Sequence, residues 1–195
     1  GGDMDELDEC SVARKAIQLL AEGVRDGAAA RAAHDYLFTY RGGKVSSTLN
    51  VLSADARTKT FVISRNNEAP VIVHTPANGL YLLDEPSQSV GVRQNTKPVI
   101  TEIPIEERVL IVVFTDGLRH AGNPSGDYLY DPLAAVGRML GEGIWSPRTI
   151  ADSLLSEALV IENGRPKDDI SVLVTAVLPD TGDDIRRLDV RLPLT

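Results

Sequence analysis

Residues 109–117 read VLIVVFTDG, an unbroken apolar run that ends in an aspartate and a glycine. The run is apolar at every position, which is typical of a β-strand that is covered on both faces. A second stretch, DDISVLV at residues 168–174, begins with two aspartates and continues as an apolar strand. If the two strands are antiparallel neighbours, the end of the first and the start of the second lie at the same edge of a sheet. Asp116 would then lie beside Asp168 and Asp169.

These carboxylates are candidate metal ligands only in combination. Taken alone, Asp-Gly is a common turn, and an Asp-Asp pair before a strand is more often a solvated strand entrance. Hard cations such as Mg²⁺ and Mn²⁺ take oxygen ligands, and two such ions about 3.5–4 Å apart lower the pKa of a bridging water and hold it for attack on phosphorus. The combined pattern therefore predicts a cation site. His120, four residues beyond Asp116, is either a proton donor to a leaving group or an ordinary loop histidine.

The order of the predicted elements indicates a sheet-rich α+β domain. Two alanine-rich helices are expected within residues 11–40. Short β-prone runs separated by turn-forming residues predict one antiparallel meander over residues 45–52, 60–64, 71–74 and 80–83. The remaining elements are a loop at 84–98, strands at 99–103, 109–114, 170–178 and 187–192, and helices at 131–140 and from Ser146-Pro147 to Asn163-Gly164. Such an order fits helices layered outside stacked sheets.

Length, charge and composition narrow the class of protein. A chain of 195 residues predicts a single domain, 1–195, in which residues 1–10 form a flexible or incomplete N-terminal segment. The one cysteine, Cys10, excludes an intramolecular disulfide. The formal net charge of −8, without a stripe of Lys and Arg, argues against a nucleic-acid partner. No stretch reads as a membrane span or signal peptide, so we expect no membrane partner and a cytoplasmic protein.

Three segments carry a resemblance to a known family. They are FTDGL at residues 114–118, GRPKDDISVLV at 164–174 and TFVISRNNEAPVIV at 60–73. The first two resemble the C-terminal metal motifs of the metal-dependent protein serine/threonine phosphatases of the 2C type. All three are similar to the bacterial subgroup named for stage II sporulation protein E. The resemblance covers roughly residues 11–178, and its specific part is the Thr-Asp-Gly and Asp-Asp pair in this order.

The resemblance implies a fold and an activity. The fold would be a four-layer α-β-β-α sandwich with two antiparallel sheets flanked by helices. Asp116 and Asp168 would be catalytic metal ligands, and Asp169 a neighbouring or alternative ligand, for two ions of Mn²⁺ or Mg²⁺. A water activated by these metals would attack a phosphoserine or phosphothreonine. The substrate would be a phosphorylated regulatory protein, such as an anti-sigma-factor antagonist or a stressosome-like scaffold, in bacterial partner-switching signalling.

The N-terminus departs from the family pattern. Members carry an early aspartate, followed closely by Gly-x-Gly, whose carboxylate bridges both metals. None of the aspartates in GGDMDELDE, residues 1–9, is followed by such an element, although Asp3 could be its remnant. Either the chain has lost a ligand and is a weak or inactive phosphatase, or residues are missing between Glu9 and the next helix. The undamaged remainder favours the second explanation.

Two rival functions stay open on the sequence alone. The missing Gly-x-Gly element favours a catalytically silent, phosphatase-like module that senses a partner or ligand. The retained Asp116, Asp168 and Asp169 favour an enzyme, which could also be a two-metal hydrolase of small phosphoesters. Metal-dependent turnover separates the silent module from the two enzymes.

Overall fold

The computed structural model describes the backbone of residues 2–122 and 130–179, and the side chains of residues 10–122 and 130–179. The helices are α1 (Gly2–Ala21), α2 (Asp26–Arg41), α3 (Asp116–His120), α4 (Pro132–Gly141) and α5 (Pro147–Ile161). The strands are β1 (Leu49–Asp55), β2 (Thr60–Asn66), β3 (Val71–Thr75), β4 (Gly79–Leu83), β5 (Val99–Pro104), β6 (Leu110–Phe114) and β7 (Val172–Ala176). The strand predicted at residues 187–192 lies outside the described residues.

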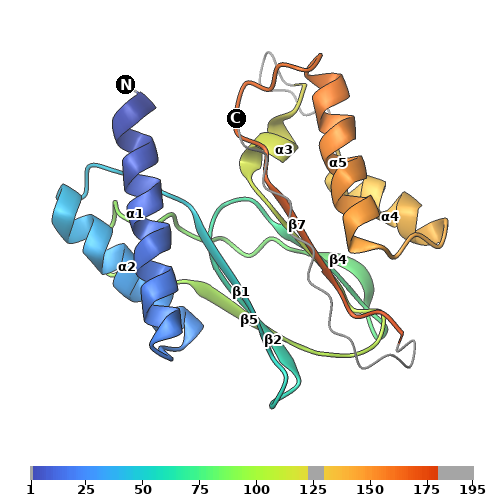
Figure 1. The fold of residues 1–195 in the computed structure, drawn as a ribbon, viewed down its shortest axis with the longest axis horizontal. Helices are drawn as coiled ribbons and strands as arrows, with labels where there is room; N and C mark the ends of the chain where they lie inside the picture. Colours follow the sequence, from blue (N-terminus) through green and yellow to red (C-terminus); the bar gives the residue numbers. More distant parts are fainter. Residues whose placement is uncertain (1, 123–129, 180–195) are drawn as a thin grey trace.

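Two antiparallel sheets stack face to face, and helices cover both outer faces (Figure 1). One sheet has three strands in the order β1-β2-β5, and the other has four in the order β4-β3-β6-β7. Helices α1 and α2 lie on the outer side of the first sheet, and α4 and α5 on the outer side of the second. The predicted α+β fold, a four-layer α-β-β-α sandwich, is confirmed.

The strands predicted as one meander belong to two sheets. β1 pairs with β2 and β3 pairs with β4, but the second edge of β2 pairs with β5 instead of β3. The connection from Asn66 to Val71 carries the chain from one sheet to the other, and the side chain of Asn67 supports it by accepting the N–H of Ala69 at 2.9 Å. The meander prediction is wrong at this connection, because turn-forming residues mark a reversal without stating which sheet receives the next strand.

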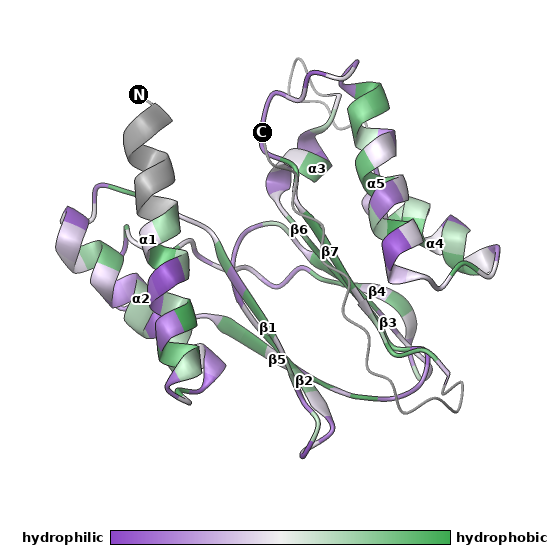
Figure 2. Ribbon diagram, in the orientation of Figure 1, coloured by the Kyte–Doolittle hydropathy of each residue, from purple (hydrophilic) through white to green (hydrophobic). Residues whose placement is uncertain are grey.

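Buried apolar residues form three clusters, one for each interface between neighbouring layers. Figure 2 shows hydrophobic residues along the strands and in the helices that flank them. Strand β6 contributes to two of the clusters. Leu110, Val112 and Phe114 pack toward α4 and α5, whereas Ile111 and Val113 pack against the other sheet. Because successive side chains of a strand point to opposite faces, a strand buried on both sides is apolar at every position. The arrangement therefore explains the sequence of this strand.

Helices α4 and α5 begin at capping side chains. The carboxylate of Asp131 accepts the backbone N–H groups of Leu133 at 3.0 Å and Ala134 at 3.1 Å. The hydroxyl of Ser146 accepts the N–H of Thr149 at 3.3 Å. These bonds satisfy N–H groups that have no partner inside the helix. Both helices lie within about two residues of their predicted positions, as capping signals allow.

Two other helices differ from the sequence-based expectation. Helix α1 begins at Gly2, so residues 2–10, expected to form a flexible or incomplete segment, have helical backbone that crosses Glu9 and Cys10 without a break. Helix α3 occupies five residues, starting at Asp116, where the sequence favours only a turn. Within residues 2–122 and 130–179, no helix combines the length and apolarity that crossing a membrane requires.

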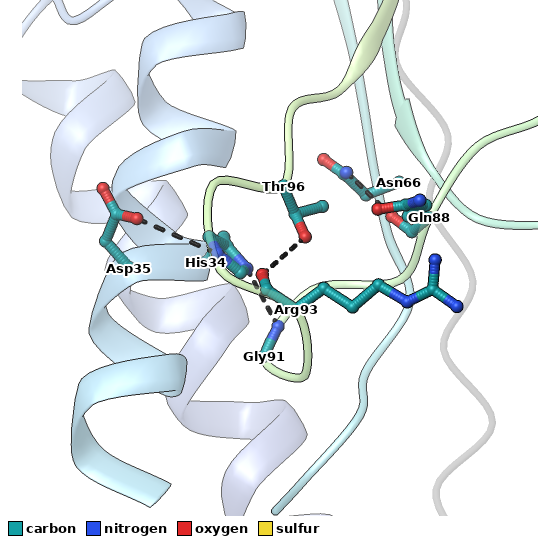
Figure 3. A network of polar contacts seen from close by, with 7 residues as sticks. All are labelled: His34, Asp35, Asn66, Gln88, Gly91, Arg93 and Thr96. Carbon is teal, nitrogen blue, oxygen red and sulfur yellow. Dashed lines mark hydrogen bonds and ion pairs between the residues drawn. The ribbon is translucent and has the colours of Figure 1, made fainter. Parts of the chain in front are cut away.

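Buried polar side chains at the end of β2 hold the loop between β4 and β5. The guanidinium of Arg65, a residue only 2% exposed, donates to the backbone carbonyls of Asn67 and Glu85. The amide of Asn66 donates to the carbonyl of Gln88 at 2.9 Å (Figure 3). The charge of Arg65 would also suit a contact with an anion. Its burial and its carbonyl partners assign it to the structure of the loop.

His34 in α2 contacts the same loop from the helical side (Figure 3). The residue is 1% exposed, and its Nδ1 accepts the backbone N–H of Gly91 at 3.0 Å. Because Nδ1 is the acceptor, the neutral ring carries its proton on Nε2, which lies 3.8 Å from a carboxylate oxygen of Asp35. Protonation of Nδ1 would remove the acceptor for Gly91.

We expect His34 to make the fold less stable as the pH falls below about 6.5. Burial lowers the pKa of His34 from its ordinary value of 6.5, and Asp35 offsets this only in part. In this range the unfolded chain binds a proton that the folded chain does not, so the free energy of unfolding decreases until the pH reaches the lowered pKa. Urea unfolding should show a larger loss between about pH 7 and 5 for the wild type than for His34→Asn, whose amide oxygen can accept from Gly91 without titrating. Parallel curves would contradict the assignment.

Candidate metal centre

The pairing of β6 with β7 brings the two aspartate motifs to one edge of the four-stranded sheet. The strands are antiparallel with Phe114 opposite Val172, and a bond from the N–H of Thr115 to the carbonyl of Ser171, at 3.1 Å, extends the ladder by one step. Beyond this step the chain enters α3 on one side and leads to Asp168 on the other. The antiparallel neighbours expected from the sequence are therefore present.

The hydroxyl of Thr115 joins the end of β6 to the segment before β7. Its Oγ1 donates to the carbonyl of Asp169 at 2.8 Å and accepts the N–H of Ser171 at 2.9 Å. The carboxylate of Asp168 accepts the N–H of Asp169 at 2.9 Å. These bonds restrict the backbone that carries Asp168, and a restricted backbone fixes ligand geometry better than a free loop does.

A close backbone contact at Gly117 sets the distance between α3 and the segment that precedes β7. A Cβ atom added to Gly117 would lie 2.4 Å from the carbonyl oxygen of Asp169 and 3.0 Å from its carbonyl carbon. Non-bonded atoms do not approach this closely, so only glycine allows the contact. The glycine of the Thr-Asp-Gly motif thus has a steric role that is separate from the role of Asp116.

Three side chains meet at this edge. Asp116, His120 and Asp168 each offer a ligand atom, these atoms lie within 4.8 Å of one another, and all three residues are exposed. Asp116 and His120 are four residues apart in α3, which places them on one face of the helix. The side chain of Asp169 is not part of this group, although its backbone makes the contacts described above. The sequence alone offers His120 only as a proton donor or an ordinary loop histidine, because its spacing from Asp116 has meaning only once α3 is known to be helical.

A small pocket of about 80 Å³ opens beside these residues. Its lining residues are Gly117, His120, Glu162, Lys167, Asp168 and Ile170. Glu162, at the end of α5, is 9% exposed and its carboxylate accepts the N–H of Gly122, just beyond α3. Helix α5 therefore holds the C-terminal end of α3. A larger hollow lies between α1 and α2, in the helical layer of the other sheet.

The donor set is suited to a divalent cation. Carboxylates bind Mg²⁺ and Mn²⁺ through oxygen, and imidazole is a common ligand of transition metals. The side chains are exposed, so they can rotate toward an ion that arrives from solvent. Asp116, His120 and Asp168 can therefore hold a metal ion.

Comparison with known families agrees with this geometry. Residues 9–178 match the sequence profile of the family Stage II sporulation protein E (SpoIIE). The chain belongs to the SpoIIE family. The matched region contains both aspartate motifs and the strands that carry them, and it confirms the resemblance read from the three sequence segments. Among curated protein sequences no match was found.

Solved structures share the fold. The PP2C phosphatase domain of SpoIIE from Bacillus subtilis, with a fragment of its regulatory domain, gives a TM-score of 0.70 at 15% identity over 89% of this chain and 50% of that one. The RsbU and RsbW domains of Rv1364c from Mycobacterium tuberculosis give 0.63 at 19% over 84% and 45%. The catalytic domain of the phosphatase PstP, in complex with two manganese ions, gives 0.60 at 13% over 86% and 80%. The chain spans about half the length of the first two, and identities this low show the fold alone.

Proposed function

We propose that this domain is a metal-dependent protein serine/threonine phosphatase. The observation that carries the proposal is the meeting of Asp116, His120 and Asp168 at the joined ends of β6 and β7, in a chain of the SpoIIE family. In this proposal Asp116 and Asp168 are the catalytic ligands of Mn²⁺ or Mg²⁺, two ions are used, and Asp169 is a neighbouring or alternative ligand.

The metal would activate the water, and residues of the chain would hold the metal and the phosphate. A bound divalent ion lowers the pKa of a water and offsets negative charge on the phosphoryl oxygens. Asp116 and Asp168 would hold the ion at the ends of packed strands, so the sheet would fix its position. Lys167 lines the same pocket, and its ammonium group adds positive charge that favours binding of a phosphate dianion. The reaction then needs no nucleophile from the protein.

The shape of the site favours a protein substrate. Pockets that enclose a small molecule commonly measure about 300–1,000 Å³. The pocket here measures about 80 Å³, and the adjoining side chains of Asp116, His120 and Asp168 are exposed. A phosphoserine or phosphothreonine on a protein surface can reach such a site without being enclosed. We therefore propose a phosphorylated regulatory protein as substrate, such as an anti-sigma-factor antagonist in cytoplasmic partner-switching signalling, and the likeness to RsbU and RsbW domains supports this choice.

A catalytically silent binding module is the second candidate. It is favoured by one observation: none of the aspartates at residues 3, 5 and 8 is followed by a Gly-x-Gly element. A module of this kind would keep the fold and bind a partner without hydrolysing a phosphoester.

The proposal is tested by hydrolysis of an aryl phosphate by the full-length protein. We expect turnover with added Mn²⁺, its loss with a chelator, and its recovery when excess Mn²⁺ is restored. Absence of metal-dependent turnover would contradict the proposal and favour the silent module. A second comparison uses a phosphoserine protein and a nucleotide: faster hydrolysis of the phosphoprotein is expected, and a preference for the nucleotide would identify a small-molecule phosphoesterase instead.

A further inference from the structure

The histidine in the proposed metal centre distinguishes it from a site built only of carboxylates. His120 and Asp116 project from the same face of α3, and Asp168 faces them from the segment before β7. His120 also lines the pocket that contains Asp168 and Lys167. Its ring therefore lies at the position where the proposed function places a metal ion.

The spacing of the three side chains allows them to share one ion. Around an octahedral ion with bonds of about 2.1 Å, adjacent ligand atoms are about 3.0 Å apart and opposite ones about 4.2 Å apart. The three ligand atoms lie within 4.8 Å of one another. Because all three residues are exposed, their side chains can rotate to bring these atoms closer together around an ion. Coordination by Nδ1 or Nε2 of His120 therefore requires no rearrangement of the sheet.

A nitrogen ligand changes which metal the site prefers. Mg²⁺ favours oxygen ligands and keeps several waters, whereas a nitrogen ligand raises the affinity of a site for first-row transition ions, among which Mn²⁺ gains least. We propose that His120 is a direct nitrogen ligand of the ion held by Asp116 and Asp168, and that it makes the site select Mn²⁺ over Mg²⁺. This inference rests on the proposed function, which places an ion at the site. It adds that His120 is a ligand of that ion and that the site prefers Mn²⁺.

Pulsed electron paramagnetic resonance of Mn²⁺ bound to the full-length protein tests the ligand directly. The wild type should show ¹⁴N coupling from a coordinated imidazole, and His120→Gln should lose it while retaining the fold. His74→Gln is the matched control, because His74 pairs with Leu110 at the opposite end of β6. The coupling should survive in this variant. Absence of ¹⁴N coupling in the wild type, or its persistence in His120→Gln, would overturn the proposal.

Calorimetric titration with Mn²⁺ and with Mg²⁺ tests the selectivity. His120→Gln should lower Mn²⁺ affinity by roughly 10-fold or more, on the scale of changes around metal ligands, and lower Mg²⁺ affinity less. Equal losses for both ions would overturn the selectivity. Asp116→Asn separates this inference from the proposed function. If Asp116→Asn abolishes Mn²⁺ binding but His120→Gln does not change it, the metal site stands without its histidine; if Asp116→Asn leaves Mn²⁺ binding unchanged, both fail.

Discussion

Replacement of Asp116 by asparagine is expected to reduce Mn²⁺-dependent phosphoester hydrolysis by about 100-fold or more, the effect of removing one group that stabilises transition-state charge. Asparagine preserves the shape of the side chain and removes the negative charge that would hold the ion. Asp116 begins α3 directly after Thr115, whose hydroxyl donates to the carbonyl of Asp169. No neighbouring exposed side chain therefore occupies a position from which it could replace Asp116 at the site. Initial rates with an aryl phosphate, measured over a range of Mn²⁺ concentrations, give the effect on both turnover and metal affinity.

The same variant should separate catalysis from stability. Asp116 and Asp168 place two carboxylates close together, and like charges at this distance oppose folding. Without metal, Asp116→Asn should therefore melt within roughly 3 °C of the wild type. Added Mn²⁺ should raise the Tm of the wild type by mass action and that of the variant much less. Asp152→Asn, on the exposed side of α5, should match the wild type in both assays. Full activity in Asp116→Asn would remove this residue from the site.

The sheet could be predicted from the sequence wherever packing controls composition. A strand buried on both faces must be apolar throughout, so the run VLIVVF predicts a strand that is covered on both sides. The second apolar run, at residues 170–174, supplies its antiparallel partner β7. The transfer of the chain between sheets after Asn66 could not be predicted, because it depends on which edge of β2 is free. β5 occupies that edge, and it lies more than thirty residues later in the chain.

The sequence predicted the two carboxylates of the candidate site but not that His120 lies beside them. Asp116 and Asp168 follow and precede recognisable strands, so their meeting depends only on strand pairing. His120 joins them through one helical turn of five residues, and a segment that short leaves no apolar periodicity in the sequence. Arg65 illustrates another limit of the sequence. Its charge indicates a possible anion contact, but its backbone partners become visible only when the loop between β4 and β5 is placed against β2.

Gly117→Ala should damage the site without touching a proposed ligand. Alanine has the higher helix propensity, by roughly 0.5–1 kcal/mol, so local preference alone would stabilise α3. The new Cβ would lie 2.4 Å from the carbonyl oxygen of Asp169. That oxygen belongs to the backbone, and the position of a Cβ is fixed by its own backbone, so no side-chain rotation relieves the contact. Overpacking of this kind costs about 1–3 kcal/mol and is relieved only by moving α3 from the segment before β7. A displacement of about 1 Å in a catalytic group can lower the rate about 100-fold, so we expect a loss of that order in metal-dependent turnover.

Gly141→Ala provides the matched control for this argument. Gly141 ends α4, and a Cβ added there would meet no atom within 4 Å. The same substitution should therefore leave turnover unchanged and keep or slightly raise the Tm, because only helix propensity acts. If Gly117→Ala instead retains wild-type turnover and Mn²⁺ affinity, the spacing between α3 and the Asp168-Asp169 segment does not control the metal centre. If both alanine variants lose stability equally, backbone flexibility rather than the contact with Asp169 explains the effect.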